Sequence, residues 1–336
     1  MLVERKRLLD ALMFVASGLD KEGMVEQSSH FIFGDGMVST YSDSVSCSAK
    51  SPLDIDCVVL AEPLLALVRR LPDSLEIEMK DEGLSIKSGR KRGTVKVEQS
   101  LKTPITKIEK PVEWKKLPKG FTDAVDIVRG CAGTDNSVFL LTCVNFTKRW
   151  VEASDGYQVC RYPIDLPINT GMVVRSASLK FIAKHLMVEC SETENWLHLR
   201  NQEGQTVSCR RFVERYPSNK IDAVLNADGM TGIELAEDLS SCLKTCQIFS
   251  SDSEEGNLVE VRLKKDKLRL EGRGKHGSYS EVLDTKYDGS PLRFRISPSL
   301  LEAVTRKKGR CEISDSILKV VCGAFTFATA TLPLED

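Results

Sequence analysis

Long apolar runs are absent from this sequence of 336 residues. No stretch approaches the roughly 18 apolar residues that a membrane-spanning helix needs. The first ten residues, MLVERKRLLD, place charges where a secretory signal peptide needs an apolar core. The sequence therefore predicts no membrane span and no signal peptide, and we expect the protein in the cytoplasm.

Histidine is scarce, with four residues, and the eleven cysteines include no C-x-x-C pair. Most of the cysteines lie in apolar alternating runs such as VVCGAF and LLTCVNF, where cysteine behaves as a small buried side chain. Cys242 and Cys246 are four residues apart and can share a helix face. Because no His or Cys cluster has ligand spacing, we expect reduced structural thiols, no metal site and no cofactor.

Catalytic motifs are missing as well. The sequence contains no Gly-rich phosphate loop, no G-x-S-x-G and no H-E-x-x-H. Asp155 could be a general base, but Ser154-Asp155-Gly156 is more typical of a turn between strands, and Gly272-Arg273-Gly274 is also predicted to be a turn. With these motifs missing, catalysis by a nucleophilic cysteine is the one enzymatic mechanism that we can envisage. No cysteine is paired with a histidine in the sequence, so we expect no enzyme.

The composition describes an ordinary globular protein, with 41% hydrophobic and 28% charged residues. The formal net charge is −1. A value this close to zero does not exclude nucleic-acid binding, because the distribution of charge over the surface decides that property.

One order of elements occurs three times, at a spacing close to a third of the chain. The first helix-like stretch of each copy lies around Leu8, Phe121 and Leu239, which are 113 and 118 residues apart. A turn-bearing strand follows, and then a second short helix around Leu64, Leu179 and Leu300. Since these landmarks recur in the same order and at similar spacings, the sequence predicts a three-fold internal repeat.

Each copy is expected to be an α+β domain with two helices packed on antiparallel sheets of roughly eight strands. The predicted domains are residues 1–108, 109–226 and 227–336. In the second copy, alternating residues predict a strand in VFLLTCVNF, and apolar spacing predicts that SASLKFIAKHLM is the second helix.

The predicted helices share a further property, because the face that is not apolar often carries lysine or arginine. These basic residues are Arg5, Arg69, Arg70, Arg129, Lys180, Lys184, Lys244 and Arg306. Any one of these residues can be explained as an ordinary charged side chain that is exposed to solvent. Their recurrence in all three copies favours a common basic surface.

The repeat resembles a known family in the order and spacing of short motifs. These are VERKRLL near the N-terminus, SGRKR at 88–92, VEASDGYQVC at 151–160, RFVERYP at 211–217, LRLEGRGKHGSYSEVLDTKYDG at 268–289 and the ending TLPLED. Together they are similar to the bacterial DNA polymerase sliding clamp, the β processivity subunit, over essentially the whole chain.

The resemblance implies a ring and a use for the basic surface. In sliding clamps three similar domains per chain form half of a ring, two chains meet head to tail, and helices line a bore for duplex DNA. The eight basic residues would then face DNA and contact phosphates without reading sequence. The dimer is expected to form through sheet edges near Gly93 to Leu101 and Val259 to Leu270, with Ile248 and Phe249 packing nearby.

The family also docks polymerases, the clamp loader and repair proteins, each through a short peptide with apolar anchors. The resemblance places this pocket at Gly156, Tyr157, Val159, Pro217, Ala330, Leu332, Pro333 and Leu334. Ordinary core packing is the alternative for these residues. The chain departs from the family at Tyr157, where histidine is usual, in SNKID after Pro217, and at Glu335-Asp336. A divergent clamp, for example one encoded by a phage, fits these departures.

Two other classes of protein remain open. A clamp-like scaffold would bind partner peptides without being loaded on DNA, and it has no need of basic helix faces. An enzyme would need a site that the sequence does not reveal. Ring-forming processivity factor is the leading interpretation.

Overall fold

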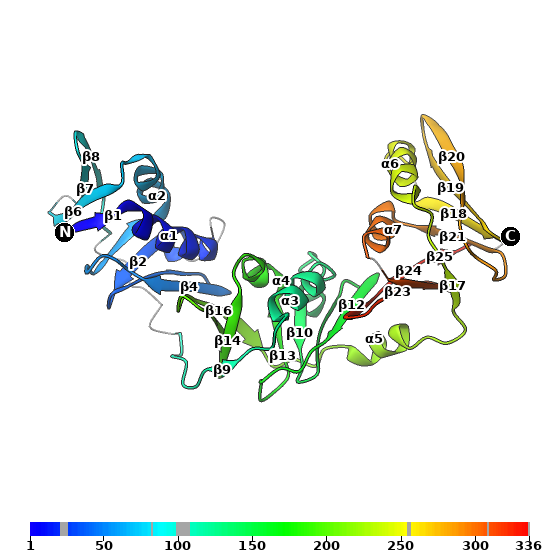
Figure 1. Ribbon diagram of the computed structural model, residues 1–336, viewed down its shortest axis with the longest axis horizontal. Coiled ribbons are helices and arrows are strands. Elements are labelled where there is room, and N and C mark those ends of the chain that lie inside the picture. Colours follow the sequence, from blue (N-terminus) through cyan, green and yellow to red (C-terminus); the bar gives the residue numbers. More distant parts are fainter. Residues whose placement is uncertain (21–25, 82, 99–107, 254–256, 308, 335–336) are drawn as a thin grey trace. The chain divides into compact units, whose positions relative to one another are not determined.

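The structure is a computed structural model that describes residues 1–20, 26–81, 83–98, 108–253, 257–307 and 309–334 (Figure 1). The chain divides into two compact units. The first consists of Met1–Asp126, Phe146–Arg149 and Ile164–Glu214, and the second of Ile127–Asn145, Trp150–Pro163 and Arg215–Asp336. The predicted second domain contributes to both units, and the three-domain division stays a prediction.

The first unit contains two antiparallel sheets. The smaller sheet has the order β1-β6-β7-β8, and the larger has the order β13-β16-β4-β3-β2-β5, with β15, β14 and β9 continuing from β16. The strands are β1 (Leu2–Glu4), β2 (His30–Gly34), β3 (Met37–Tyr41), β4 (Val45–Lys50), β5 (Cys57–Leu60), β6 (Ser74–Lys80), β7 (Gly83–Ser88), β8 (Lys91–Val95), β9 (Lys115–Lys116), β13 (Met172–Arg175), β14 (Met187–Glu192), β15 (Trp196–Asn201) and β16 (Thr206–Phe212).

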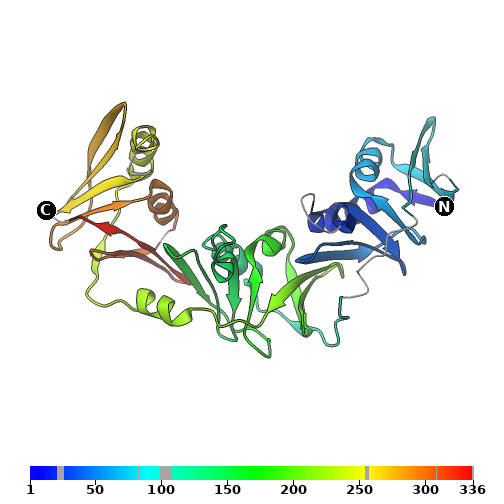
Figure 2. The ribbon, with the colours of Figure 1, turned by 180° about the vertical axis from the view of Figure 1, so that it is seen from behind.

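Pairing of β16 with β4 joins residues of the first and second predicted copies in one sheet, with Val207 opposite Cys47. Helix α1 (Arg5–Val15) buries Leu8, Leu12 and Val15 against β3 and β4. Helix α2 (Ala61–Arg70) packs beside α1, as Figures 1 and 2 show. Both helices occur where the apolar spacing predicts them.

The predicted helix over SASLKFIAKHLM is shorter than expected. It consists of one turn, α4 (Ser176–Leu179), followed by the 3-10 turn η5 (Ile182–Lys184). Leu179 and Ile182 are fully buried, and the chain becomes extended at His185. These short turns are enough to bury both apolar side chains, which are three residues apart. The apolar pattern therefore overstates the length of the helix.

The second unit also contains two antiparallel sheets, of order β17-β22-β23-β24-β12-β11-β10 and β20-β19-β18-β21-β25. Their strands are β10 (Cys143–Phe146, whose last residue is counted with the first unit), β11 (Trp150–Ser154), β12 (Gln158–Pro163), β17 (Thr231–Ile233), β18 (Val259–Lys264), β19 (Lys267–Gly274), β20 (Gly277–Asp284), β21 (Leu292–Ile296), β22 (Arg310–Ile313), β23 (Ile317–Cys322), β24 (Phe325–Ala330) and β25 (Leu332–Pro333). The pair β12–β24 joins the second and third predicted copies, with Val159 opposite Ala328.

Helices of the second unit occur where the sequence predicts them, with one addition. Helix α6 (Leu239–Ser250) packs on β19 and β20 and contacts α7 (Pro298–Thr305), while α3 (Phe121–Arg129) begins in the first unit and ends in the second. Helix α5 (Ser218–Leu225) was not expected. The stretch VFLLTCVNF is also only partly a strand, because η4 (Phe139–Thr142) precedes β10. The predicted α+β class with antiparallel sheets is confirmed.

The prediction of a turn at Gly272-Arg273-Gly274 is wrong, because these residues belong to β19. A Cβ atom at Gly272 would collide with the backbone of Cys246, and one at Gly274 would collide with the carbonyl oxygen of Phe249. Glycine is needed here because helix α6 lies directly on the strand, and the chain reverses only after Gly274.

The expected interface edge at residues 259–270 is also wrong. Strands β18 and β19 have partners on both sides, and the edge strands of this sheet are β20 and β25. In the first unit the expected edge is present as β8, beside β7, while residues 99–101 of the predicted segment lie outside the described residues.

Candidate functional site

A cavity of about 450 Å³ opens in the second unit between β12, β24, η4 and α5. Its walls are largely apolar. The lining residues are Val138, Leu140, Leu141, Ser154, Gly156, Tyr157, Gln158, Val159, Arg215, Pro217, Lys220, Ile221, Val224, Ile317, Ala328 and Ala330. An apolar hollow with a few polar groups at its edge is suited to anchoring the apolar side chains of a ligand.

The turn after β11 shapes one edge of the cavity. The Asp155 carboxylate accepts hydrogen bonds from the backbone N–H groups of Tyr157 and Gln158, both at 2.8 Å. Gly156 has a φ of +95°, a conformation that favours glycine. This is the Asx turn predicted from the sequence, and it leaves the Tyr157 side chain 68% exposed at the rim.

Backbone pairing continues from this turn into β24. The N–H of Ala330 donates to the carbonyl oxygen of Tyr157 at 2.7 Å, and Val159 pairs with Ala328 in the β12–β24 register. Two segments about 170 residues apart in sequence therefore form adjoining walls of the cavity.

Helix α5 forms another wall, and a buried ion pair holds it in place. Glu152 on β11 is fully buried, and its carboxylate accepts hydrogen bonds from Arg161 Nε at 2.8 Å, Asn145 Nδ2 at 2.8 Å and the hydroxyl of Ser218. Arg161 also contacts Asp222 of α5, with 2.6 Å between Nη1 and Oδ1. The start and the middle of α5 are thus tied to the sheet.

Tyr216 fixes the segment just before α5. Its hydroxyl oxygen accepts a hydrogen bond from the N–H of Ser154 at 3.0 Å, which joins this segment to the turn on the opposite edge. The ring is 7% exposed, and burial raises the pKa of Tyr216 well above its usual range, so the hydroxyl stays protonated.

Removing the buried cation should be costly. We expect Arg161→Met to lower the free energy of unfolding by about 3 to 5 kcal/mol, because the Glu152 carboxylate would remain buried without its partner. Asp222→Asn is the matched control: this carboxylate is half exposed, so its loss should cost about 1 kcal/mol or less. Urea denaturation measures both, and equal losses for the two variants would contradict the assigned role of the buried pair.

The structure brings five of the eight predicted pocket residues together. Gly156, Tyr157, Val159, Pro217 and Ala330 line the cavity. The other three do not, because Leu332 and Pro333 form β25, which pairs with β21, and the N–H of Leu334 donates to the carbonyl oxygen of Arg293. The expected wall of Leu332, Pro333 and Leu334 is instead supplied by Ile317, Ala328 and Ala330. A contact between these three residues and a bound peptide stays a prediction.

Sequence reasoning missed the residues that η4 and α5 contribute to the cavity. In α5, Ile221, Val224 and Leu225 follow the i, i+3, i+4 spacing of an amphipathic helix, so the pattern was present in the sequence. In η4, the run Val138 to Leu141 reads as a strand, and no local signal indicates that its side chains face a cavity.

Five of the eight predicted basic residues belong to the first unit: Arg5, Arg69, Arg70, Lys180 and Lys184. Arg69 contacts the sulfur of Met13 on α1, and the ring of His185, next to Lys184, packs on Phe14 of α1 with centroids 4.7 Å apart. Helices α1 and α2 and the turn η5 are therefore neighbours. Arg5 is paired with Asp73 at 3.0 Å, while the other four are exposed.

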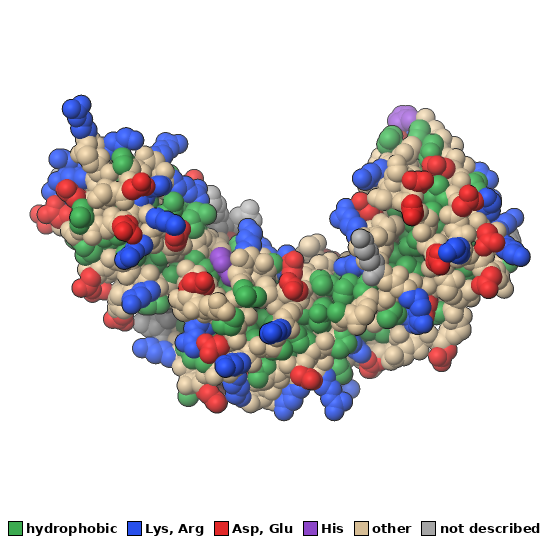
Figure 3. All heavy atoms as spheres, in the orientation of Figure 1, with side chains coloured by type: hydrophobic (Ala, Val, Ile, Leu, Met, Phe, Trp, Pro, Cys, Tyr) green, Lys and Arg blue, Asp and Glu red, His purple; other side chains and the backbone are tan. Residues whose placement is uncertain are grey.

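The three remaining basic residues lie on helices of the second unit or at their ends. Arg129 ends α3, Lys244 is exposed on α6, and Arg306 follows α7, where it is paired with Glu302 at 2.8 Å. In the first unit a further basic group lies beside α2: Lys91 of β8 donates to the carbonyl oxygen of Arg70 at 3.2 Å. Figure 3 shows lysine and arginine side chains gathered over α2 and the β7–β8 hairpin.

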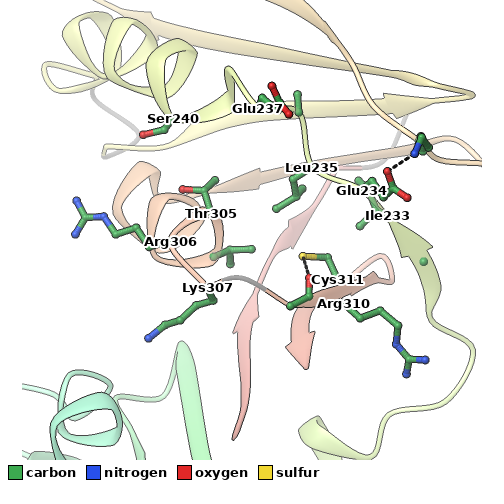
Figure 4. Close-up of a pocket in the computed structure, with 15 residues that line it drawn as sticks. Ile233, Glu234, Leu235, Glu237, Ser240, Thr305, Arg306, Lys307, Arg310 and Cys311 are labelled. Carbon is green, nitrogen blue, oxygen red and sulfur yellow. Dashed lines mark hydrogen bonds and ion pairs between the residues drawn. The ribbon is translucent and has the colours of Figure 1, made fainter. Parts of the chain in front are cut away.

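A larger cavity of about 860 Å³ lies in the second unit between α6, α7 and β22 (Figure 4). Several of its charged groups are paired: Lys286 with Glu234 at 2.6 Å, and Arg310 at its edge with Glu312 at 2.6 Å. Arg306 and Lys307 extend outward from the end of α7. We assign this cavity no ligand.

A hydroxyl, a histidine and a carboxylate lie in a row in the first unit. Ser208 Oγ is 2.8 Å from His198 Nδ1, Thr193 Oγ1 is 3.4 Å from Nε2, and Glu109 accepts two hydrogen bonds from Asn195. Ser208 is 7% exposed and His198 1%, and burial lowers the pKa of His198 to about 4. A hydroxyl with so little access to solvent cannot attack a substrate. We assign these hydrogen bonds a structural role, which is to hold Glu109 against the β14–β15 hairpin.

All eleven cysteines are buried and none forms a disulfide. Burial raises the pKa of the Cys47 thiol to about 11, and the same cause raises that of Cys190 to about 11. Thiolates are the reactive form of cysteine, and at neutral pH these thiols are protonated. The structure therefore offers little support for a cysteine nucleophile.

Membrane spans and metal clusters are both absent from the described residues. None of the helices there is both long and apolar enough to cross a membrane. Within the same residues, no three or more His, Cys, Asp or Glu side chains are grouped so that they could hold a metal ion.

Comparison with solved structures gives extensive matches. The chain is similar to the DNA polymerase sliding clamp of Pseudomonas aeruginosa (TM-score 0.83, 16% identity, 99% of each chain covered). It is also similar to the β chain of DNA polymerase III from Streptococcus pneumoniae (TM-score 0.86, 17% identity, 99% of each chain covered) and to the β subunit from Thermotoga maritima (0.83, 15%, 99% of each). No family model and no curated protein sequence matches the chain. At these identities the likeness establishes the fold, and the predicted sliding-clamp fold is confirmed.

Proposed function

We propose that the protein is a sliding clamp: a ring that encircles duplex DNA and tethers a replicative polymerase, and so acts as a cytoplasmic processivity factor. The observation that carries this proposal is the match in fold to clamps over 99% of the chain. A protein that shared only one domain with clamps would not match along its whole length.

Three domains per chain and two chains per ring are part of the proposal. A head-to-tail dimer needs two different edges on each chain, and the edge strands of the sheets include β8 in the first unit and β20 in the second. Strand β8 begins with the exposed cations Lys91 and Arg92, whereas β20 carries Glu281 and Asp284. Ile248 on α6 and Val282 on β20 are 69% and 58% exposed, and the proposed contact would cover them.

DNA binding is assigned to the basic helix faces. Lys180 and Lys184 are exposed close together in the turns after β13, and Lys244 is exposed on α6. Exposed cations on short turns suit contacts with phosphates, which carry no sequence information and weaken as salt rises. Weak contacts are appropriate for a ring that must slide, because the closed ring itself prevents dissociation.

Peptide docking is assigned to the 450 Å³ cavity. It has apolar walls, it is open to solvent, and it contains five of the residues that the family resemblance implies. Its partners are proposed to be the polymerase, the clamp loader and repair proteins, each through a short segment with apolar anchors.

Filling the cavity should stop docking. Ala330 is exposed at the cavity, so Ala330→Trp should place an indole ring in it without disturbing the core. We expect the affinity for a labelled polymerase-tail peptide to fall at least about tenfold, as the loss of one apolar anchor of about 1.5 to 3 kcal/mol implies.

The control for this change is Val112→Trp, which adds the same ring at a residue that is 90% exposed and does not line the cavity. Fluorescence anisotropy measures both variants. If Ala330→Trp bound the peptide as tightly as the unaltered protein, docking would have to occur elsewhere.

A scaffold that docks peptides without DNA is the second candidate, and the same cavity supports it. Salt titration of binding to a DNA duplex separates the two functions. A clamp should bind all sequences alike, with affinity that falls linearly with the logarithm of salt concentration. A pure scaffold should show no such binding.

A further inference from the structure

A methionine lies on the solvent-exposed face of α1 and touches a cation of the neighbouring helix. Met13 is 47% exposed, although the residues on either side of it, Leu12 and Phe14, are buried. Its sulfur is 2.7 Å from Nη2 of Arg69, in the last turn of α2. Both helices belong to the first unit and pack side by side. The contact therefore joins an accessible thioether to one of the basic residues to which DNA binding is assigned.

Arg69 has no stronger partner than this sulfur. In the part of the chain that the structure describes, no carboxylate is paired with Arg69, and its side chain is exposed. Two further cations are near, because Arg70 follows it and Lys91 donates to the carbonyl oxygen of Arg70 at 3.2 Å. A thioether is a weak hydrogen-bond acceptor. The contact with Met13 thus leaves the guanidinium able to turn toward a phosphate.

We propose that Met13 is a site of oxidation by hydrogen peroxide, and that its sulfoxide holds Arg69 against α1 and so removes one cation from the DNA-facing surface. The oxidation and its effect on Arg69 depend only on the contact between the two side chains. The effect on DNA rests on the proposed function.

The oxidation needs no reactant other than the peroxide. The sulfur lone pair of Met13 attacks one peroxide oxygen, the O–O bond breaks, and the proton of the transferred hydroxyl leaves with the other oxygen as water. The sulfur is oxidised by two electrons and the peroxide is reduced. The product is polar, and methionine sulfoxide reductases return it to the thioether. A sulfoxide oxygen accepts a hydrogen bond from a guanidinium far better than a thioether sulfur does.

Other methionines of the first unit provide internal comparisons. Met79 of β6 is 41% exposed, close to the value for Met13, whereas Met172 and Met187 are 1% and 3% exposed. Oxidation requires access to the sulfur. We expect dilute peroxide to oxidise Met13 and Met79 and to spare the two buried methionines, and only the oxidation of Met13 should change the behaviour of Arg69.

The first test does not involve DNA. The full chain is treated with dilute hydrogen peroxide and then with phenylglyoxal, which modifies accessible guanidinium groups, and mass spectrometry locates both changes. Oxidation of Met13 should slow the labelling of Arg69 and leave that of Arg70 unchanged. In Met13→Leu, peroxide should not affect the labelling of Arg69. If Met13 stayed reduced while Met79 was oxidised, or if Arg69 was labelled equally fast before and after oxidation, the proposal would be overturned.

The second test measures the consequence for DNA binding. Oxidised protein should bind a duplex about threefold less tightly at low salt, with a salt slope shallower by up to about 0.9, because one phosphate contact is lost. Met13→Gln keeps a polar acceptor at this position and should reproduce the effect without peroxide. Treatment with methionine sulfoxide reductases of both stereospecificities should restore the oxidised protein. Met79→Gln is the matched control, and it should leave DNA binding unchanged.

The outcomes distinguish the inference from the function on which it partly depends. If the reduced, unaltered protein binds no duplex, the proposed function fails, and the labelling of Arg69 alone decides whether the sulfoxide holds this side chain. If the reduced protein binds DNA and oxidation of Met13 changes neither affinity nor salt slope, the clamp function stands and the inference is overturned. An equal loss on oxidation of Arg69→Gln would also overturn it, because the effect would then not act through Arg69.

Discussion

Ile248→Glu is expected to convert the protein from a dimer into a monomer. Ile248 is 69% exposed at the end of α6, beside the β19–β20 hairpin, so glutamate at this position should not disturb the fold of one chain. In the proposed ring the side chain is covered by the next chain. A charge buried there without a partner should cost about 3 to 5 kcal/mol at each of the two interfaces.

Light scattering at micromolar concentration measures the result directly. The unaltered protein should show twice the chain mass of 37.3 kDa, and the variant should show the mass of one chain. Val112→Glu, at an exposed residue that belongs to neither β8 nor β20, should remain a dimer. Two results would remove the proposed interface: a dimer that tolerates Ile248→Glu, or an unaltered protein that is monomeric at every concentration.

Charge reversal at Lys180 and Lys184 is expected to have the second large effect. If both lysines contact phosphates, Lys180→Glu/Lys184→Glu should weaken binding to duplex DNA about equally for all sequences. The slope of log affinity against log salt should become shallower by about 0.9 for each phosphate that is no longer neutralised.

The control for charge is Lys264→Glu/Lys265→Glu, which changes the net charge by the same amount on an exposed hairpin of the second unit. It should retain most of the DNA affinity and the original salt slope. Binding that becomes sequence-selective, or that falls equally in both variants, would show that Lys180 and Lys184 do not contact the DNA backbone.

The helices that begin the predicted copies could be found from the sequence because they bury an apolar stripe. In α1 the buried residues Leu8, Leu12 and Val15 keep helical spacing, and Leu239, Leu243 and Cys246 do the same in α6. Such spacing is a local signal. The lengths of short helices are less predictable. Helix α4, for example, ends at the buried Leu179, well before the end of the predicted helix.

Glycines caused one of the errors in the prediction of strands. Gly156 takes a positive φ in a turn, as expected, whereas Gly272 and Gly274 are in a strand that lies against the backbone of α6. Both uses of glycine look the same in a sequence. The difference depends on which helix packs on which strand, and that is a long-range property.

The candidate site was predictable only in part for the same reason. The family resemblance implied Gly156, Val159 and Ala330, and the pairing of β12 with β24 brings them together. Nothing local indicates that Glu152 and Arg161 anchor α5. That ion pair joins neighbouring strands to a helix about sixty residues later, and it determines where Ile221 and Val224 lie.

The most direct test of the proposed function is whether the protein stays on DNA by encircling it. Fluorescent protein is threaded onto a tethered linear duplex, the free end is then closed with a bulky block, and single molecules are followed at a salt concentration that abolishes ordinary binding. A sliding clamp should diffuse along the DNA for many minutes and be released at once when a restriction enzyme cuts the duplex. Protein that dissociates equally fast from blocked and unblocked DNA, or that stays bound after the cut, would contradict the account.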